Sequence, residues 1–233
     1  MKKAKKKEFK LEIYSDIVCP WCYVGKRYID AALQHYRDTY PNEAMPEVVS
    51  LPFQLHAALP AQGVDRVEYM KRRYPGQANS LEMFAPATKA GRSQGVEFHF
   101  ERITVQPNTM NAHRLLRFAE RRDARDPLTE DLFRAYFVDG KNLSDNEVLA
   151  DLAQSCGLDR AKVLTYLAGD EDREWVKEVD ARAKYLGVRT VPFIILNGKK
   201  GVFANQPAHK IFDALRWARK DYSRPAWLSW LSS

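Results

Sequence analysis

The sequence predicts an α/β fold in which a β-α-β unit and a β-β-α unit are separated by a large inserted α-helical domain. Three observations indicate this order. Residues 8–15 alternate with period two and lead into a helical pattern, residues 64–184 show mostly helical patterns, and a β-type run returns at 188–198. The chain has 233 residues, of which 45% are hydrophobic, so it can bury a core without disulfide staples.

The first β-α-β unit begins with a predicted strand over residues 8–15. Its side chains alternate between two faces: Phe9, Leu11 and Ile13 on one, Lys10, Glu12 and Tyr14 on the other. A helix is expected to follow and to end at Pro41 and Asn42. A second strand is expected over residues 48–56, where Pro52 indicates an edge, a bulge or a bent end.

The middle of the chain is predicted to be helical, and its C-terminal part to form the β-β-α unit. Helical patterns cover residues 64–74, 81–95, 109–124, 128–140, 144–157, 158–169 and 170–187. The apolar run at 188–198 then predicts a strand, and Asn197-Gly198 is a strong signal for a hairpin turn. A short returning strand and a helix that starts at Pro207 complete the predicted order.

These patterns predict one discontinuous domain, residues 8–60 and 185–222, and an inserted α-helical domain over residues 61–184. Two segments lie outside both: a basic N-terminal arm at 1–7 and a Trp-rich tail at 223–233. The net charge of +7 owes much to the lysines of the arm. Without a basic stripe that interleaves with aromatic residues, no nucleic-acid binding is expected.

Hydropathy and the first residues give an expectation about location. No run approaches the roughly 18 apolar residues of a membrane span, so no membrane association is expected. No apolar segment follows the basic N-terminus, as it would in a secretory signal. The protein is therefore expected to be cytoplasmic.

The sequence CPWC places Cys19 and Cys22 at the start of the first helix. Cysteines at positions i and i+3 of a first helical turn lie on one face, close enough to form a disulfide. Pro20 suits the first helical position because its missing N–H would have no helical partner there. The unpaired N–H groups and the helix dipole favour a thiolate at Cys19. We therefore predict that Cys19 attacks and that Cys22 resolves the mixed disulfide.

Other uses of these cysteines fit the sequence less well. A structural zinc site needs four ligands, usually with a second close pair, so no metal is expected. A Cys–His hydrolase would leave Cys22 without a role, and inert buried cysteines would not explain the strand-to-helix position. The third cysteine, Cys156, lies in an apolar helical stretch and is interpreted as a core residue. His113 and Asn111 are candidate cleft residues, with helix surface or a satisfied polar contact as the alternative.

Four segments together resemble the DsbA-like thiol–disulfide oxidoreductases, and their FrnE-type branch most closely: SDIVCPWCYVGK, LPFQL, PNTMNAHRLLRFA and GVRTVPFIILNG. The resemblance extends from Phe9 to Tyr222. It implies a thioredoxin-like fold interrupted by a helical domain, in agreement with the order above. It also implies that Pro192 is the cis-proline of a loop facing the cysteines, where the backbone of Val191 can pair with an extended substrate. The expected substrate-binding residues are Thr190, Val191, Pro192, Pro20 and Trp21.

The predicted function is thiol–disulfide exchange with protein or small-molecule thiols through a mixed disulfide on Cys19. No resident cofactor is expected, glutathione is a candidate redox partner, and the assembly is expected to be a monomer or a homodimer. Two alternatives stay open. One is a glutathione-dependent isomerase or kappa-type glutathione transferase, although such enzymes generally have a serine and no CxxC here. The other is a chaperone or binding module that does not use the cysteines. The direction of exchange is left open by the sequence.

Overall fold

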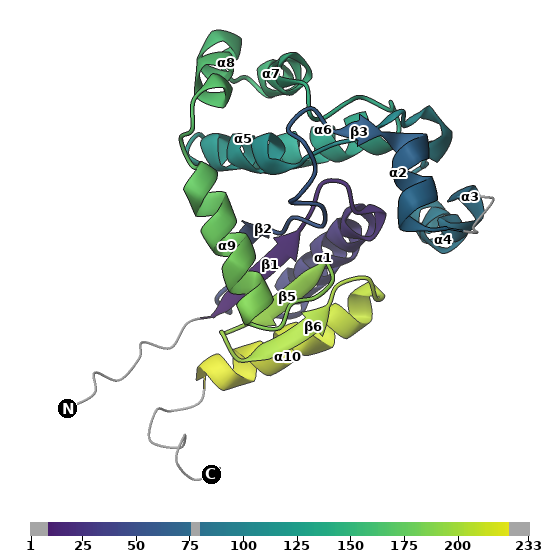
Figure 1. The fold of residues 1–233 in the computed structure, drawn as a ribbon. Coiled ribbons are helices and arrows are strands. Elements are labelled where there is room, and N and C mark those ends of the chain that lie inside the picture. The colour runs from purple at the N-terminus through teal and green to yellow at the C-terminus, as the bar shows by residue number, and fades with distance from the viewer. Residues whose placement is uncertain (1–8, 76–79, 224–233) are drawn as a thin grey trace.

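A computed structural model describes residues 9–75 and 80–223 of the chain. The predicted basic arm at 1–7 and, apart from Ser223, the predicted tail at 223–233 lie outside the described residues. Within them the chain forms a mixed α/β structure, with a sheet and its covering helices at one end and a group of helices at the other (Figure 1). The predicted fold class is confirmed.

The sheet has four strands in the order β2-β1-β5-β6. Strand β1 (Lys10–Ser15) pairs in parallel with β2 (Glu47–Pro52) and antiparallel with β5 (Phe193–Leu196), which pairs antiparallel with β6 (Lys200–Phe203). Strand β2 is an edge of the sheet and ends at Pro52, as the proline predicts. The two central strands, β1 and β5, therefore come from opposite ends of the chain.

Helices α1 (Pro20–Thr39) and α10 (Ala208–Ser223) pack together against one face of the sheet. The apolar stripe of α10 follows the helical period and consists of Ile211, Ala214, Leu215 and Ala218. These side chains share a buried cluster with Leu11 and Ile13 of β1 and with Ile29 of α1. The sequence of α10 thus forms a helix whose apolar face is covered by the sheet.

Helix α9 (Arg173–Tyr185) lies near the opposite face of the sheet (Figure 1). Its Asp180 carboxylate accepts a hydrogen bond of 2.9 Å from the Gln54 backbone N–H, and Arg182 pairs with Glu12 at 3.3 Å. Both Glu12 and Tyr14 are buried, although the period-two pattern places them opposite the apolar side chains of β1. Strand β1 is therefore covered on both faces.

The helical part of the chain differs from the predicted segments in two places. The helices are α2 (Arg66–Arg73), α3 (Ser80–Met83), α4 (Ala85–Ser93), α5 (Met110–Glu120), α6 (Arg125–Phe137), α7 (Asn146–Ser155) and α8 (Arg160–Ala168). The predicted helix over 81–95 is divided at Phe84 into α3 and α4, and Pro86, which has no backbone N–H, lies in the first turn of α4. The predicted helix over 64–74 is also too long, since β3 (Val64–Asp65) pairs with β4 (Val105–Gln106).

A single apolar cluster runs from the sheet into the helical part. It contains Cys19 and Cys22 together with rings from α1 and α6. Tyr23 stacks on Phe133 with a centroid distance of 4.9 Å, and Phe98 and Phe137 lie within the same group of rings. The two cysteines therefore lie where the sheet end and the helical part share one core. The predicted domain boundaries stay a prediction.

Candidate functional site

The cysteine pair lies at the junction between β1 and α1. Cys19 is the N-cap residue of α1 and Pro20 its first residue, as the CPWC spacing predicts. The Cys19 carbonyl accepts a hydrogen bond of 2.9 Å from the Cys22 backbone N–H, which begins the first helical turn. Both cysteines are free thiols and both are buried. This first turn therefore holds two thiols, with Cys19 at the positive end of the helix dipole.

The loop before β5 faces Cys19. The Val191–Pro192 peptide bond is cis, and the Cys19 thiol lies 3.5 Å from the Val191 carbonyl oxygen. Gly25 of α1 allows this close approach, because a Cβ atom there would lie 2.7 Å from Pro192 Cγ. The arrangement implied by the family resemblance is therefore present, although the two segments lie far apart in the sequence.

The other predicted site residues differ in their surroundings. Pro20 is half-buried and lines a groove together with Cys19. Trp21 is half-buried and packs against the apolar core. Thr190 is exposed, and no contact within the described residues joins its side chain to Cys19. The structure thus brings Cys19, Val191 and Pro192 together but leaves Thr190 at the surface, and the roles of these residues in binding stay a prediction.

Asp16 is a fully buried carboxylate next to the cysteine pair that sequence reasoning missed. Its backbone N–H points at Cys22 Sγ at 3.5 Å, and its Oδ2 accepts a hydrogen bond of 2.8 Å from the Leu55 N–H. His113 Nε2 lies 3.3 Å from Asp16 Oδ1, at ion-pair distance but without hydrogen-bond alignment. Asp16 therefore joins β1, the loop after β2 and α5 behind the cysteines. Its only sequence signal is a lone acidic residue three positions before Cys19.

Burial affects the ionisation of Cys22. It raises the pKa of Cys22 well above its usual value, and hydrogen bonding and charge from Cys19 act in the same direction. Cys22 is therefore held as a neutral thiol at neutral pH. A neutral thiol is a poor nucleophile.

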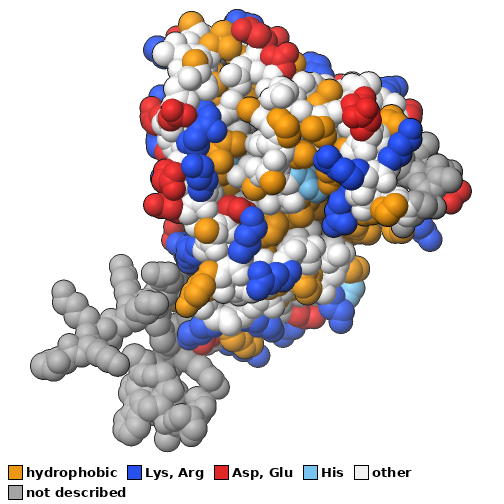
Figure 2. All heavy atoms as spheres, viewed as in Figure 1, with side chains coloured by type: hydrophobic (Ala, Val, Ile, Leu, Met, Phe, Trp, Pro, Cys, Tyr) orange, Lys and Arg blue, Asp and Glu red, His pale blue; other side chains and the backbone are white. Residues whose placement is uncertain are grey.

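The two cysteines also line different spaces. Cys19 lines a groove of about 820 Å³ that the loop after β2 and α2 border. Cys22 instead lines a separate pocket of about 170 Å³ together with His113 and Pro192. In the space-filling view an apolar hollow with Lys and Arg side chains around it lies between α9 and α2 (Figure 2). Cys19 therefore borders the groove, whereas Cys22 does not line it.

Two other residues that the sequence singled out, Cys156 and Asn111, contact neighbouring polar side chains. Cys156 follows α7 and is half-buried, with Sγ 3.4 Å from the Asp131 carboxylate. Asn111 donates a hydrogen bond of 2.9 Å to the Asn146 side chain, so it makes the satisfied polar contact that was one alternative. Among the described residues, no group of His, Cys, Asp and Glu side chains is placed to hold a metal ion. No helix in the described part of the chain is long and apolar enough to cross a membrane.

Comparison with known proteins gives a family match over most of the chain. Residues 10–216 match the model of the DSBA-like thioredoxin domain family. The Bacillus subtilis protein YwbO is 29% identical over 189 residues, which cover 79% of this chain and 86% of YwbO. A crystal structure of a probable DsbA oxidoreductase from Streptomyces coelicolor is also 29% identical. It aligns with a TM-score of 0.80 over 93% of this chain and 91% of its own.

More distant solved structures show the same fold. The cytosolic disulfide reductase DsbM of Pseudomonas aeruginosa, solved with GSH, has a TM-score of 0.57 at 16% identity and covers 91% of this chain and 96% of its own. A 2-hydroxychromene-2-carboxylate isomerase has a TM-score of 0.61 at 15% identity and covers 96% of this chain and 99% of its own. Proteins of different activity therefore share this architecture.

Proposed function

The chain belongs to the DSBA-like thioredoxin domain family, and we propose that it is a thiol–disulfide oxidoreductase whose redox pair is Cys19 and Cys22. One observation carries the proposal. Cys19 lines the groove at the N-terminus of α1 and faces Val191, whereas Cys22 does not line it. One thiol thus borders the space that a substrate sulfur would enter, and a second thiol lies within the same helical turn.

The proposed reduction proceeds in two exchanges. The Cys19 thiolate attacks one sulfur of a substrate disulfide, so that a Cys19–substrate bond forms, the substrate S–S bond breaks, and the leaving thiolate takes up a proton. Cys22 then loses its proton and attacks Cys19 Sγ. A Cys19–Cys22 disulfide forms and the second substrate thiol is released, so two electrons pass from the pair to the substrate. The reverse sequence oxidises a dithiol.

This chemistry needs no resident cofactor, because the two sulfur atoms of the pair carry both electrons. The proposed partners are protein or small-molecule thiols and disulfides, with glutathione as a redox partner. We place the reaction in the cytoplasm, where glutathione and thioredoxin keep most thiols reduced. The glutathione-dependent isomerase alternative is less favoured, since a second thiol within the same turn would have no role in it.

Replacing Cys22 by serine tests the proposal directly. The Cys22→Ser variant is expected to accumulate a mixed disulfide on Cys19, because no resolving thiol remains within the turn. Incubation with a disulfide-bonded peptide and mass spectrometry of the intact protein measure the adduct. The matched control is Cys19→Ser, and both variants also carry Cys156→Ser, so that the control keeps only the Cys22 thiol and should form no adduct. Equal labelling of both variants would contradict the assignment of Cys19 as the attacking residue.

The raised pKa of Cys22 predicts the pH dependence of the second exchange. Only the thiolate attacks, so release of substrate from a preformed Cys19 mixed disulfide should accelerate about tenfold per pH unit between pH 6 and 8. The rate is expected to rise with pH because burial favours the neutral Cys22 thiol and moves its ionisation to higher pH. Stopped-flow measurement of peptide release checks the rate. A plateau below pH 8 would contradict the prediction, and the same adduct on Cys22→Ser controls for release by other routes.

A further inference from the structure

The groove in front of Cys19 is lined by basic side chains and by no Asp or Glu among the described residues. Five cations contribute: Arg66, Arg72, Arg73, Lys184 and Arg189. The nearby carboxylate of Asp16 is buried and already accepts a hydrogen bond from Leu55. Burial lowers the pKa of His56, so this groove histidine adds no charge at neutral pH. The positive charge is therefore that of the arginines and the lysine.

Within residues 9–75 and 80–223, most of these cations have no anionic partner. Lys184 pairs with Asp180, and the Arg66 guanidinium bonds to the Gln106 side chain, which is neutral. Arg72, Arg73 and Arg189 are exposed, and in the described part of the chain no carboxylate pairs with any of them. An arrangement of unpaired arginines around an open hollow attracts negatively charged ligands and raises their local concentration.

The cations lie on two sides of the groove. Three of them come from α2, and the other two come from the end of α9 and the loop before β5. Figure 2 shows Lys and Arg side chains around this apolar hollow. Its surface includes aromatic rings, among them Phe53 and Tyr69. A ligand that reaches Cys19 therefore meets apolar surface below it and positive charge on both sides.

Resting on the proposed function, we propose that the preferred substrate is a polypeptide segment with acidic residues on both sides of its reactive cysteine. Such a segment presents its sulfur to Cys19 while its carboxylates approach Arg72 and Arg73 on one side and Arg189 on the other. Arginine binds carboxylates in bidentate geometry, which adds specificity to the electrostatic attraction.

The length of the basic surface favours a polypeptide over a small thiol. Arg66 and Arg73 are separated by seven residues of helix, a rise of roughly 10 Å, which equals about three residues of extended chain. Lys184 and Arg189 extend the surface from another element. The groove volume of about 820 Å³ lies within the range for small-molecule sites, roughly 300–1,000 Å³, so it is the spread of the cations and not the volume that favours a polypeptide.

The test compares peptides that differ only in the charge beside the cysteine. Each peptide has one cysteine flanked on both sides by two Glu, two Gln or two Lys residues, and is disulfide-bonded to 2-mercaptoethanol. The reduced full-length protein is expected to reduce the Glu peptide on the order of tenfold faster than the Gln peptide at 50 mM salt. The Lys peptide should be slower still. The ratios should fall towards one at 500 mM salt, where the screening length is short.

Charge reversal on α2 assigns the preference to the groove. Arg72→Glu and Arg73→Glu should each slow reduction of the Glu peptide several-fold and leave the Gln peptide within twofold. The matched control is Lys71→Glu, which makes the same charge change on the same helix but outside the groove. Equal effects of all three variants, or equal rates for the three peptides, would overturn the inference.

Two further substrates separate the possible failures. Hydroxyethyl disulfide is small and neutral: if the dithiol protein does not reduce it faster than free dithiol, the proposed function fails. If hydroxyethyl disulfide is reduced but the Glu, Gln and Lys peptides react at equal rates, the proposed function stands and only the inference about acidic substrates fails. Glutathione disulfide carries carboxylates on a small molecule. If Arg72→Glu slows its reduction as much as that of the Glu peptide, the polypeptide assignment is overturned in favour of a small anionic thiol.

Discussion

Replacing Cys19 by serine is expected to abolish disulfide reduction and to leave only the uncatalysed rate. A serine hydroxyl does not displace a thiolate from a disulfide, so the first exchange cannot occur. Cys22 is not expected to replace Cys19, because it does not line the groove and burial raises its pKa. Reduction of insulin by dithiothreitol, followed as turbidity, measures the loss.

The third cysteine supplies the control for this experiment. Cys156 follows α7 and does not line the groove, so Cys156→Ser should keep near wild-type activity. Retained insulin reduction by Cys19→Ser would contradict the proposed function. Suppression of substrate aggregation on the same variants separates the remaining alternative, since a chaperone that does not use its cysteines would retain this activity in Cys19→Ser.

The part of the site that depends on local sequence was predictable. The strand-to-helix junction, the helix start at Pro20 and the first-turn position of both cysteines follow from CPWC itself. The approach of Pro192 to Cys19 came only from the family resemblance, because nothing in the sequence around residue 192 indicates what the loop faces. Gly25 now gives a local reason for this approach, since a side chain at this position would meet Pro192.

The rest of the site depends on tertiary contacts between distant segments. Asp16 meets Leu55 and His113 only after β2 and α5 pack behind the cysteines. The sequence shows an arginine pair at 72–73, but not that it faces the same groove as Arg189. Pattern reasoning assigns residues to a face of their own element. It does not say which other element covers that face.

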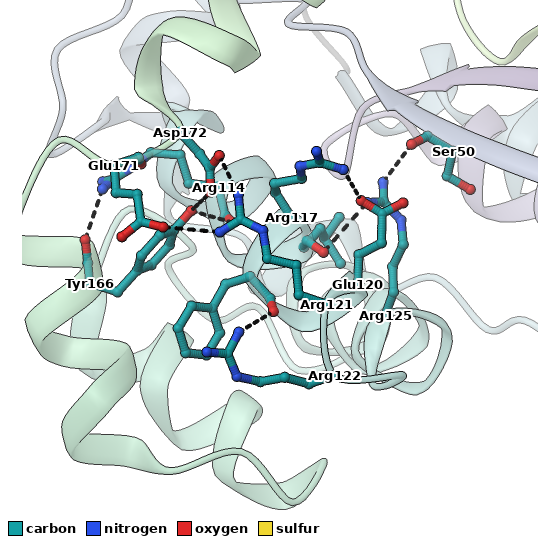
Figure 3. A network of polar contacts seen from close by, with 12 residues as sticks. Ser50, Arg114, Arg117, Glu120, Arg121, Arg122, Arg125, Tyr166, Glu171 and Asp172 are labelled. Carbon is teal, nitrogen blue, oxygen red and sulfur yellow. Dashed lines mark hydrogen bonds and ion pairs between the residues drawn. The ribbon is translucent and has the colours of Figure 1, made fainter.

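The same limit applies to α5, where the sequence shows an amphipathic helix but not the role of its buried arginine. Arg114 is fully buried, and its guanidinium donates hydrogen bonds to four backbone carbonyls and to the Asn111 side chain. The carbonyls belong to residues 166, 167, 169 and 171, at the end of α8 and the turn into α9. Figure 3 shows Arg114 together with Tyr166 and Glu171 of this group. The last carbonyls of a helix have no partners within the helix, and a positive charge there also interacts favourably with the negative end of the helix dipole.

Replacing Arg114 by methionine should therefore lower the free energy of unfolding by about 3–5 kcal/mol, a large fraction of the stability of a typical domain, because several buried carbonyls lose their donor at once. Methionine keeps an unbranched apolar stem but leaves buried carbonyls unpaired, each at a cost of about 1–3 kcal/mol. The free energy of unfolding of Arg114→Lys should lie between those of the wild type and Arg114→Met, because an ammonium has three donors where the guanidinium has five. Urea unfolding followed by circular dichroism measures the changes.

Arg122→Met removes an exposed arginine bonded to the Phe118 carbonyl and is the matched control. If Arg114→Met is no less stable than this control, then Arg114 does not hold the turn that leads into α9. In that case the position of α9 beside the groove depends on other contacts, among them those of Arg121 with Asp172 and of Asp180 with Gln54.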